Sequence, residues 1–395
     1  MRNNDIVDKI DIARIANDLW RLLEIPSPTG NERQAALEFA TMLSATGGSI
    51  EVRVDETIHS SPCVIGRLKG NQPGKVLQIA GHIDHIDVPH PEPRREDGTI
   101  SGRGSCDMKC GLAGMFELTR LLQESGCDFP GEILVTVYGL HEEPNGNTKG
   151  ITGLIDKGVK GDAAIIMEGP SDVAIVMTMG LAKWDLLIKQ QGPVCHENIA
   201  SPERHELLKT VLTVVNTFAE KNNNLKDGYS EYKFINRPES LFIGQIHYGD
   251  FFNRMPNECR LQGTRRWHPN RSFEEVCEEM TSLSQSIPHH PDISIECNLT
   301  FIGHSCEISP SEPIVQSLLS SYKEIVKEDL RVGGWSTVTD AQRLIREAGV
   351  PTIIWGACLE NAHMDYELVE LDKLRIACQI IFRTALDYLS NNSLD

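Results

Sequence analysis

The sequence contains no long apolar run and little positive charge, and both absences narrow the function. No stretch approaches the roughly 18 consecutive apolar residues of a membrane-spanning helix, so we expect no membrane partner. Lysine and arginine number 38 against 56 aspartates and glutamates, which gives a net charge of −18. Such a chain lacks the basic surface that binds nucleic acid or anionic lipid. An anionic substrate stays compatible, because bound cations can dominate the local field.

The chain also lacks an export signal and a cysteine framework. Residues 1–9 contain no apolar signal-peptide core. The eleven cysteines are odd in number and follow no framework spacing, which indicates free thiols in a reducing compartment. We therefore expect a cytoplasmic protein. The 40% hydrophobic and 24% charged residues are typical of a globular protein.

The alternation of apolar strands and helical stretches up to about residue 180 predicts an α/β fold, with a mixed sheet covered by helices. Because 395 residues exceed one ordinary core, we expect two domains. After Gly180 the pattern changes to a half-exposed strand at 182–189 and helices near 203–221 and 272–286. We expect a catalytic domain of residues 1–180 and 309–395, with an inserted α+β lid of residues 181–308.

Two helices are expected to open the chain. The first covers about residues 11–23, and the second begins at Thr29 or Asn31. Thr29 and Glu32 have the spacing of a capping box, in which each side chain bonds a backbone N–H at the start of the helix.

Metal-competent side chains follow one predicted buried strand after another, and a further one follows a glycine-rich turn. They are His82, Asp84, Asp107, Glu142, Glu143, Glu168 and His363. In an open α/β sheet the carboxyl ends of the strands share one edge, where ligands bind. The sequence therefore predicts a His/Asp/Glu metal site at that edge.

The order of these motifs resembles that of the M20 family of zinc peptidases and amidohydrolases. The resemblance begins at residues 22–32, which look like the first helix and turn of the family, and ends at 362–367, which look like its last metal motif. It implies a zinc-exopeptidase-like catalytic domain. It also implies that the inserted lid mediates dimerisation, and so a homodimer.

The resemblance further implies a site with two divalent metal ions. Asp107 would bridge the ions, His82 and Glu168 would complete one site, and Glu143 and His363 the other. Zinc fits these ligands, and cobalt or manganese also accept imidazole and carboxylate together. Four neighbours of the motifs compete as ligands: His85, Asp87, His90 and His141.

Two carboxylates then remain without a metal. Asp84 fits a supporting role in which it accepts the second N–H of His82. Glu142 fits the general base, which takes a proton from the metal-bound water and hands it to the leaving amine.

The resemblance extends to residues that would contact the substrate. His196 looks like the lid histidine that stabilises the oxyanion in the partner subunit's active site. Asn253 and Arg266 match substrate-contacting positions, and Arg266 would pair with a substrate carboxylate. The alternative for residues 265–266 is a solvated strand. Gly356 begins a turn that commonly contacts the carboxylate end of the substrate, and here that turn departs from the family pattern.

Together these features predict a metal-dependent hydrolase that cleaves the amide bond of a small N-acyl amino acid by a metal-bound hydroxide. Deacetylases and desuccinylases are the closest functional types. Three alternatives stay open: a di- or tripeptide exopeptidase, a hydrolase of another C–N bond such as that of an aryl amine, and a non-catalytic binding protein on the same scaffold.

Overall fold

The computed structural model describes residues 6–142, 146–227, 232–357 and 361–391. The chain forms two compact units. The first contains Met1–Val176, Ile308–Gly334 and Asp340–Asp395, and the second contains Met177–Glu307 and Trp335–Thr339. The first unit is interrupted after Val176, where the sequence predicts a boundary after residue 180, and the short segment 335–339 belongs to the second unit.

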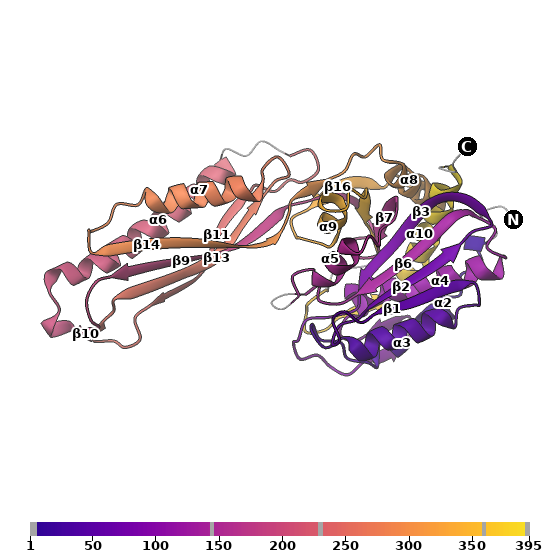
Figure 1. Ribbon diagram of the computed structural model, residues 1–395, viewed down its shortest axis with the longest axis horizontal. Coiled ribbons are helices and arrows are strands. Elements are labelled where there is room, and N and C mark those ends of the chain that lie inside the picture. Colours follow the sequence, from indigo (N-terminus) through magenta and orange to yellow (C-terminus); the bar gives the residue numbers. More distant parts are fainter. Residues whose placement is uncertain (1–5, 143–145, 228–231, 358–360, 392–395) are drawn as a thin grey trace. The chain divides into compact units, whose positions relative to one another are not determined.

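A mixed sheet forms the centre of the first unit (Figure 1). Strands β6, β3, β7 and β17 are mutually parallel neighbours, and β1, β2, β8 and β15 continue the sheet with antiparallel pairings. Strand β16 also pairs with β8. In order across the sheet, the bounds are β1 (Ile50–Asp55), β2 (Cys63–Lys69), β6 (Pro130–Tyr138), β3 (Gln72–His82), β7 (Ala163–Ile166), β17 (Thr352–Ile354), β8 (Val173–Thr178) and β15 (Cys306–Glu307), with β16 at Arg331–Trp335.

The helices of the first unit cover this sheet, and α3, α4 and α10 pack directly on its strands. The parallel strands β3 and β7 are buried along their last residues, as expected for strands covered by helices. The helices are α2 (Ile12–Leu23), α3 (Arg33–Ser44), α4 (Cys110–Glu124), α5 (Lys149–Asp156), α8 (Pro313–Val326), α9 (Ala341–Arg346) and α10 (Leu371–Asn391). A short turn, η1 (Ser105–Lys109), precedes α4, and β4 (Arg94–Glu96), β5 (Thr99–Ser101) and β18 (Leu368–Glu370) form a small separate sheet.

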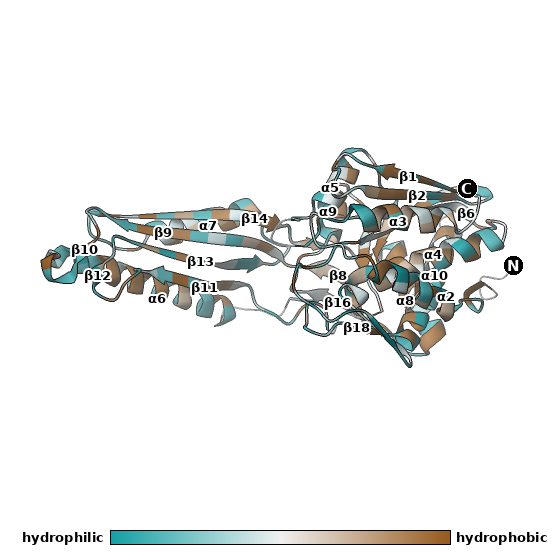
Figure 2. Ribbon diagram, turned by 90° about the horizontal axis from the view of Figure 1, so that it is seen from below, coloured by the Kyte–Doolittle hydropathy of each residue, from teal (hydrophilic) through white to brown (hydrophobic). Residues whose placement is uncertain are grey.

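The second unit is an antiparallel sheet with two long helices packed against it. Strand β9 alternates between buried and more exposed residues, and Figure 2 shows the matching alternation of hydropathy along it. Its apolar core joins Trp184 of the sheet to Phe218 and Met280 of the helices. The sheet order is β11 (Ser240–Tyr248), β13 (Glu258–Trp267), β9 (Gly180–Gln190) and β14 (Ile293–Gly303), and the helices are α6 (Glu206–Asp227) and α7 (Phe273–Gln285). The pair β10 (Cys195–His196) and β12 (Arg254–Met255) and two 3₁₀ turns, η2 (Glu197–Ile199) and η3 (Pro202–His205), complete the unit.

The capping box expected at the second helix is wrong. Helix α3 begins at Arg33, and no side chain caps it. The hydroxyl of Thr29 donates instead to Asp84 Oδ2 at 3.0 Å. The buried carboxylate of Glu32 accepts from the N–H groups of Gly30 and Leu140. Both side chains therefore tie this turn to the sheet edge rather than to the helix. Among the described helices, none is long and apolar enough to cross a bilayer.

Candidate metal centre

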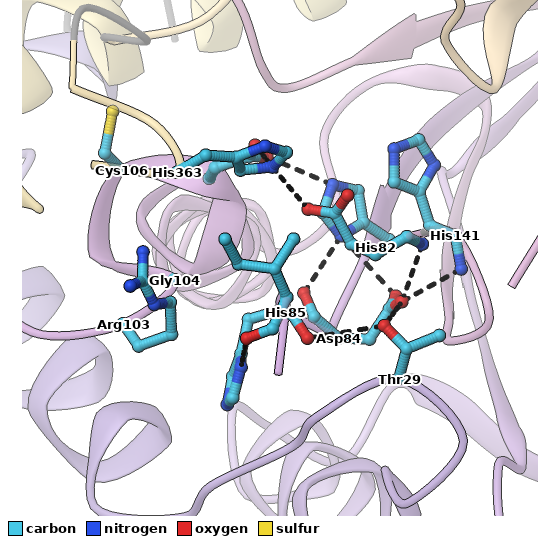
Figure 3. Close-up of polar contacts among 12 residues, drawn as sticks. Thr29, His82, Asp84, His85, Arg103, Gly104, Cys106, His141 and His363 are labelled. Carbon is cyan, nitrogen blue, oxygen red and sulfur yellow. Dashed lines mark hydrogen bonds and ion pairs between the residues drawn. The ribbon is translucent and has the colours of Figure 1, made fainter. Parts of the chain in front are cut away.

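Neighbouring parallel strands bring the first candidate ligands together. His82 is the last residue of β3, and Glu168 follows the end of the adjacent β7 by two residues. On the other side of β3, β6 ends at Tyr138 and leads into the turn that carries His141 and Glu142. Figure 3 shows His82, Asp84, His141 and His363 converging on one place. This is the edge of the sheet at which the sequence predicted the site.

His82 is fully buried, and one of its ring nitrogens faces two carboxylates. Its Nδ1–H donates to the backbone oxygen of Asp84 at 3.1 Å, which leaves the lone pair on Nε2. Nε2 lies 3.2 Å from Asp107 Oδ1 and 3.4 Å from Glu168 Oε2 but forms no hydrogen bond in the described structure. A buried imidazole nitrogen facing two carboxylates is the environment that a divalent cation would satisfy.

Asp107 connects this position to a second one. Its Oδ1 faces His82, whereas its Oδ2 lies 3.3 Å from His363 Nε2. His363 Nε2 is also 2.8 Å from Glu142 Oε1. Burial raises the pKa of Asp107, but the nearby imidazoles of His363 and His82 outweigh it and hold that pKa well below its usual range. The carboxylate is therefore ionised and lies between two imidazoles, as a bridging ligand requires.

Two groups of side chains place potential ligand atoms within 4.8 Å of one another. The first contains His82, His141 and Glu168, and the second contains Asp107, Glu142 and His363. Glu143, predicted as a ligand, lies outside the described residues. Glu142, predicted as the general base, occupies the place in the second group that the sequence analysis gave to Glu143.

His82 contacts the backbone of Asp84 rather than the carboxylate that was predicted to accept its N–H. The Oδ1 of Asp84 is 3.6 Å from His82 Nδ1, beyond hydrogen-bonding distance, because that N–H is directed to the carbonyl oxygen of the same residue. Oδ2 accepts from Thr29 Oγ1 and from the backbone N–H groups of His141 and Glu142, at 2.9–3.0 Å. Asp84 thus fixes both the ring of His82 and the turn that carries Glu142.

His141 is a neighbour of the site that the sequence analysis ranked only among competing ligands. Its ring stacks on that of His82, with centroids 4.0 Å apart and planes 7° apart. An imidazole binds zinc in the plane of its ring at about 2.0–2.1 Å, so two parallel rings at this spacing cannot bind the same ion. His141 Nδ1 lies 2.8 Å from the buried carboxylate of Asp340, whose charge outweighs burial and raises the pKa of His141 to about 9. The contact with Asp340 therefore holds the His141 ring against one face of the His82 ring.

Two other competitors, His85 and His90, use both ring nitrogens elsewhere. His85 Nε2 accepts from the N–H of Ser27 at 3.0 Å, and its Nδ1–H donates to the oxygen of Ile86 at 2.9 Å. Burial lowers the pKa of His85 to about 4. His90 is occupied in the same way by Pro91 and Glu367. Asp87, the fourth competitor, belongs to neither group. Because both of their ring nitrogens are hydrogen-bonded, His85 and His90 are excluded as metal ligands.

Glu168 is held by close backbone packing. A Cβ atom on Gly356 would lie 2.7 Å from the carbonyl carbon of Glu168, and one on Gly111 would lie 2.2 Å from the oxygen of Met167. Only glycine permits these approaches. Gly356, predicted to contact substrate, thus has a structural reason to be glycine beside a candidate ligand.

The turn that carries Asp107 is organised by Glu367, the last residue of the motif at 362–367. Its buried carboxylate accepts from the N–H groups of Gly104, Cys106 and Asp107 at 2.8–3.0 Å. It also forms an ion pair with Arg103. Because Glu367 comes four residues after His363, one short segment supplies both a candidate ligand and the support of another. A carboxylate after a metal-site histidine is the only sequence signal of this role.

The lid residues lie in the second unit. His196 Nε2 is 3.2 Å from Asn253 Nδ2, and β10 and β12 hold the two segments side by side. Arg266 donates from Nη1 to the backbone oxygen of Ser336 at 2.6 Å. It is half-buried, and it forms no ion pair with any residue that the structure describes.

A largely buried cluster of histidines and carboxylates at the carboxyl edge of a mixed sheet is an arrangement typical of metallohydrolases. The family described as Peptidase family M20/M25/M40 matches residues 79–387. The chain belongs to this family, whose members hydrolyse amide and peptide bonds.

Similar proteins extend over nearly the whole chain. An N-formyl-4-amino-5-aminomethyl-2-methylpyrimidine deformylase of Bacillus subtilis (strain 168) is 23% identical, covering 97% of this chain and 95% of that protein. A succinyl-diaminopimelate desuccinylase of Hydrogenovibrio crunogenus is 23% identical, covering 93% and 97%. The solved structure of a tripeptidase from Staphylococcus aureus subsp. aureus mu50 superposes with a TM-score of 0.78 at 17% identity, covering 97% and 99%. This last likeness confirms the predicted fold.

Proposed function

We propose that the protein hydrolyses the amide bond of a small N-acyl amino acid with a free carboxylate, using two zinc ions. The observation that carries the proposal is the position of the Asp107 carboxylate, with one oxygen beside His82 and the other beside His363. Two cations held this way would polarise the amide carbonyl and make a water molecule acidic enough to attack near neutral pH.

The protein's own groups then have separate tasks. His82, Asp107 and Glu168 would hold one ion, and Asp107, His363 and Glu143 would hold the other. The carboxylate of Glu142 takes a proton from the attacking water and delivers it to the leaving amine. Its contact with His363 keeps it at the site.

The lid contributes substrate contacts in this proposal. His196 stabilises the negative oxygen that forms on the carbonyl, acting in the site of a partner subunit, and Asn253 orients it through the contact between their side chains. Arg266 binds the substrate carboxylate, and Gly356 lines the carboxylate end of the pocket.

A homodimer is supported by the surface of the lid. Strand β11 is at the edge of its sheet and exposes Phe242 and Ile246, and α6 exposes Leu212. An apolar edge strand is a surface that a second copy would cover. Light scattering after gel filtration tests this: we expect about twice the chain mass of 44.0 kDa, and Phe242→Glu should shift it to the monomer.

A second candidate function is hydrolysis of another C–N bond, with removal of a formyl group from an aminopyrimidine derivative. It is favoured by the similarity to the Bacillus subtilis deformylase over 97% of the chain. Exopeptidase activity on di- or tripeptides would use the same metal centre.

The test is a panel of N-acetyl, N-succinyl and N-formyl amino acids, an N-formyl aminopyrimidine and dipeptides. The apo-protein is reloaded with zinc, cobalt or manganese, and each substrate is followed by release of free amine. We expect metal-dependent turnover of one N-acyl amino acid class. Turnover of the pyrimidine or of the peptides alone would replace this proposal by the corresponding alternative.

A further inference from the structure

A cavity of about 520 Å³ lies within the second unit, beside β10. Its walls come from the segment 190–204 and from Asp292, and all of these residues belong to that unit. Small-molecule sites have volumes of about 300–1,000 Å³. The cavity is therefore large enough for a ligand, and it shares no residue with the two candidate metal groups.

Arg204 places a buried positive charge at this cavity. The residue is 7% exposed, and it donates from Nη1 to the oxygen of Gln191 and from Nη2 to the oxygen of Pro256. Its Nε–H has no hydrogen-bond partner, and the guanidinium forms no ion pair, among the residues that the structure describes. An uncompensated charge is costly to bury. The cavity therefore favours an anion, which can accept from the unused N–H donors.

Gln190 adds a buried acceptor to the same cavity. Its Nε2 donates to the oxygen of Glu203 at 2.7 Å, which fixes the orientation of the amide and identifies Oε1 as the atom left over. Oε1 is buried and accepts no hydrogen bond in the described part of the chain. Buried polar atoms are normally paired. A ligand that completes the site must therefore donate to Gln190 as well as accept from Arg204.

The backbone around Arg204 holds the guanidinium in place. A Cβ atom on Gly192 would lie 2.7 Å from Arg204 Nη1, and Gly192 has a φ of +110°, which favours glycine. The hydrogen bonds to Gln191 and Pro256 fix the same side chain from two segments. Because the arginine is ordered before a ligand arrives, binding requires little loss of side-chain freedom.

The rest of the lining supplies apolar surface and negative charge. Pro193, Ile199 and Ala200 are apolar, and Ile199 is 77% exposed. Glu203 and Asp292 are exposed carboxylates, which would repel a ligand that carries negative charge alone. The lining thus selects a ligand that has both charges and an apolar part.

We propose that this cavity binds a free α-amino acid with an apolar side chain. The carboxylate of the ligand accepts from Arg204, and its ammonium group donates to Oε1 of Gln190 on the side of the two lining carboxylates. Its side chain packs against Ile199 and the neighbouring apolar residues. The inference goes beyond the proposed function and does not depend on it, because the second unit alone holds the ligand.

The experiment is isothermal titration calorimetry on the zinc-loaded full chain. The ligands are leucine, 4-methylpentanoate, which lacks the ammonium group, and 3-methylbutylamine, which lacks the carboxylate. Four chains are compared: wild type, Arg204→Gln, Ala200→Phe and Arg260→Gln. The last is the matched control, because it removes an arginine of the same unit that has its own partner, Asp185.

We expect leucine to bind wild type and Arg260→Gln equally, and Arg204→Gln about tenfold more weakly or worse, because a charge-assisted contact is lost. Ala200→Phe fills the cavity without changing Arg204 or Gln190. It should weaken leucine in the same way, and it tests the site even where Arg204→Gln fails to fold. Equal binding to all four chains, no binding of leucine to wild type, or an analogue that binds as well as leucine would overturn the proposal.

Asp107→Ala separates a ligand in this cavity from one at the metal centre. We expect Asp107→Ala to bind leucine like wild type, because the cavity contains no metal ligand. Binding that is lost in Asp107→Ala and retained in Arg204→Gln would place leucine at the metals and contradict the proposal. No substrate is present in these titrations, so the absence of amide hydrolysis would refute the proposed function and leave this result unchanged.

Discussion

Asp107 is the residue on which both candidate metal positions depend. Each of its oxygens faces a different histidine, and its backbone N–H is fixed by Glu367 at 2.8 Å. The carboxylate therefore has little freedom to turn away when an ion binds. Preorganisation of this kind lets ligand side chains bind metal without a large ordering cost.

A single substitution of Glu142 distinguishes its two candidate roles, general base and metal ligand. If it is the general base, Glu142→Gln keeps both ions and lowers kcat by about 10²–10⁴-fold, because only the proton transfer is lost. Metal content by mass spectrometry and kcat are measured on the same sample. Loss of one ion together with the activity would instead make Glu142 a ligand in the second group, where it contacts His363.

Asp340 tests the role assigned to His141. Replacing Asp340 by Asn removes the negative charge that holds the His141 ring against His82. We expect the affinity for the ion at His82 to fall about 10–100-fold, the usual effect of losing a supporting partner of a ligand. Competition with a chelator measures this, and Asp372→Asn, at a side chain that is 93% exposed, is the control. Unchanged affinity would show that the stacked ring has no effect on the site.

At the scale of elements, α7 is attached to the lid sheet by a charged network. Glu279 on α7 pairs with Arg265 at 3.0 Å and with Arg271 at 2.7 Å. Burial opposes ionisation of Glu279, but the charge of Arg265 outweighs it, and the pKa is lowered to about 2. The guanidinium of Arg265 is buried, and it needs the carboxylate of Glu279 as a partner because an unpaired buried charge is strongly destabilising.

The stability contributed by Glu279 should depend on pH with a defined sign. Because its folded-state pKa is lowered, the contribution is fully present above the unfolded pKa of about 4.3 and is lost as pH falls through the folded value. Glu279→Gln should therefore cost about 2–3 kcal/mol at pH 7 and progressively less below pH 4. Urea unfolding of the lid measures it, with the exposed neighbour Glu278→Gln as control. A cost that does not change with pH would contradict the ionic origin.

The elements were largely predictable where local signals were strong. The alternation after Gly180 predicted a strand at 182–189, close to the observed β9 (Gly180–Gln190). The capping box failed because Thr29 and Glu32 form bonds to residues far along the chain. A sequence pattern reports only on residues that are close in sequence, so it does not predict a hydrogen-bond partner as distant along the chain as Asp84.

For the whole molecule, strand order explains which site residues were found and which were not. Ligands at the ends of neighbouring parallel strands follow from the rule on sheet edges, so His82 and Glu168 were expected together and lie together. The supporting residues Asp340 and Glu367 come from return segments whose three-dimensional position no local pattern fixes. His141 was visible in the sequence, but only its stacking on His82 shows what it does.

The most direct test of the account is the number of metal ions bound per chain, measured with amide hydrolysis in wild type, Asp107→Ala and His363→Ala. We predict about two ions in wild type, as in two-metal sites with a shared carboxylate. We also predict loss of both ions and of activity in Asp107→Ala, and loss of one ion in His363→Ala. Two ions retained in Asp107→Ala, or a wild type that binds two ions and hydrolyses no amide or peptide in the panel, would contradict it.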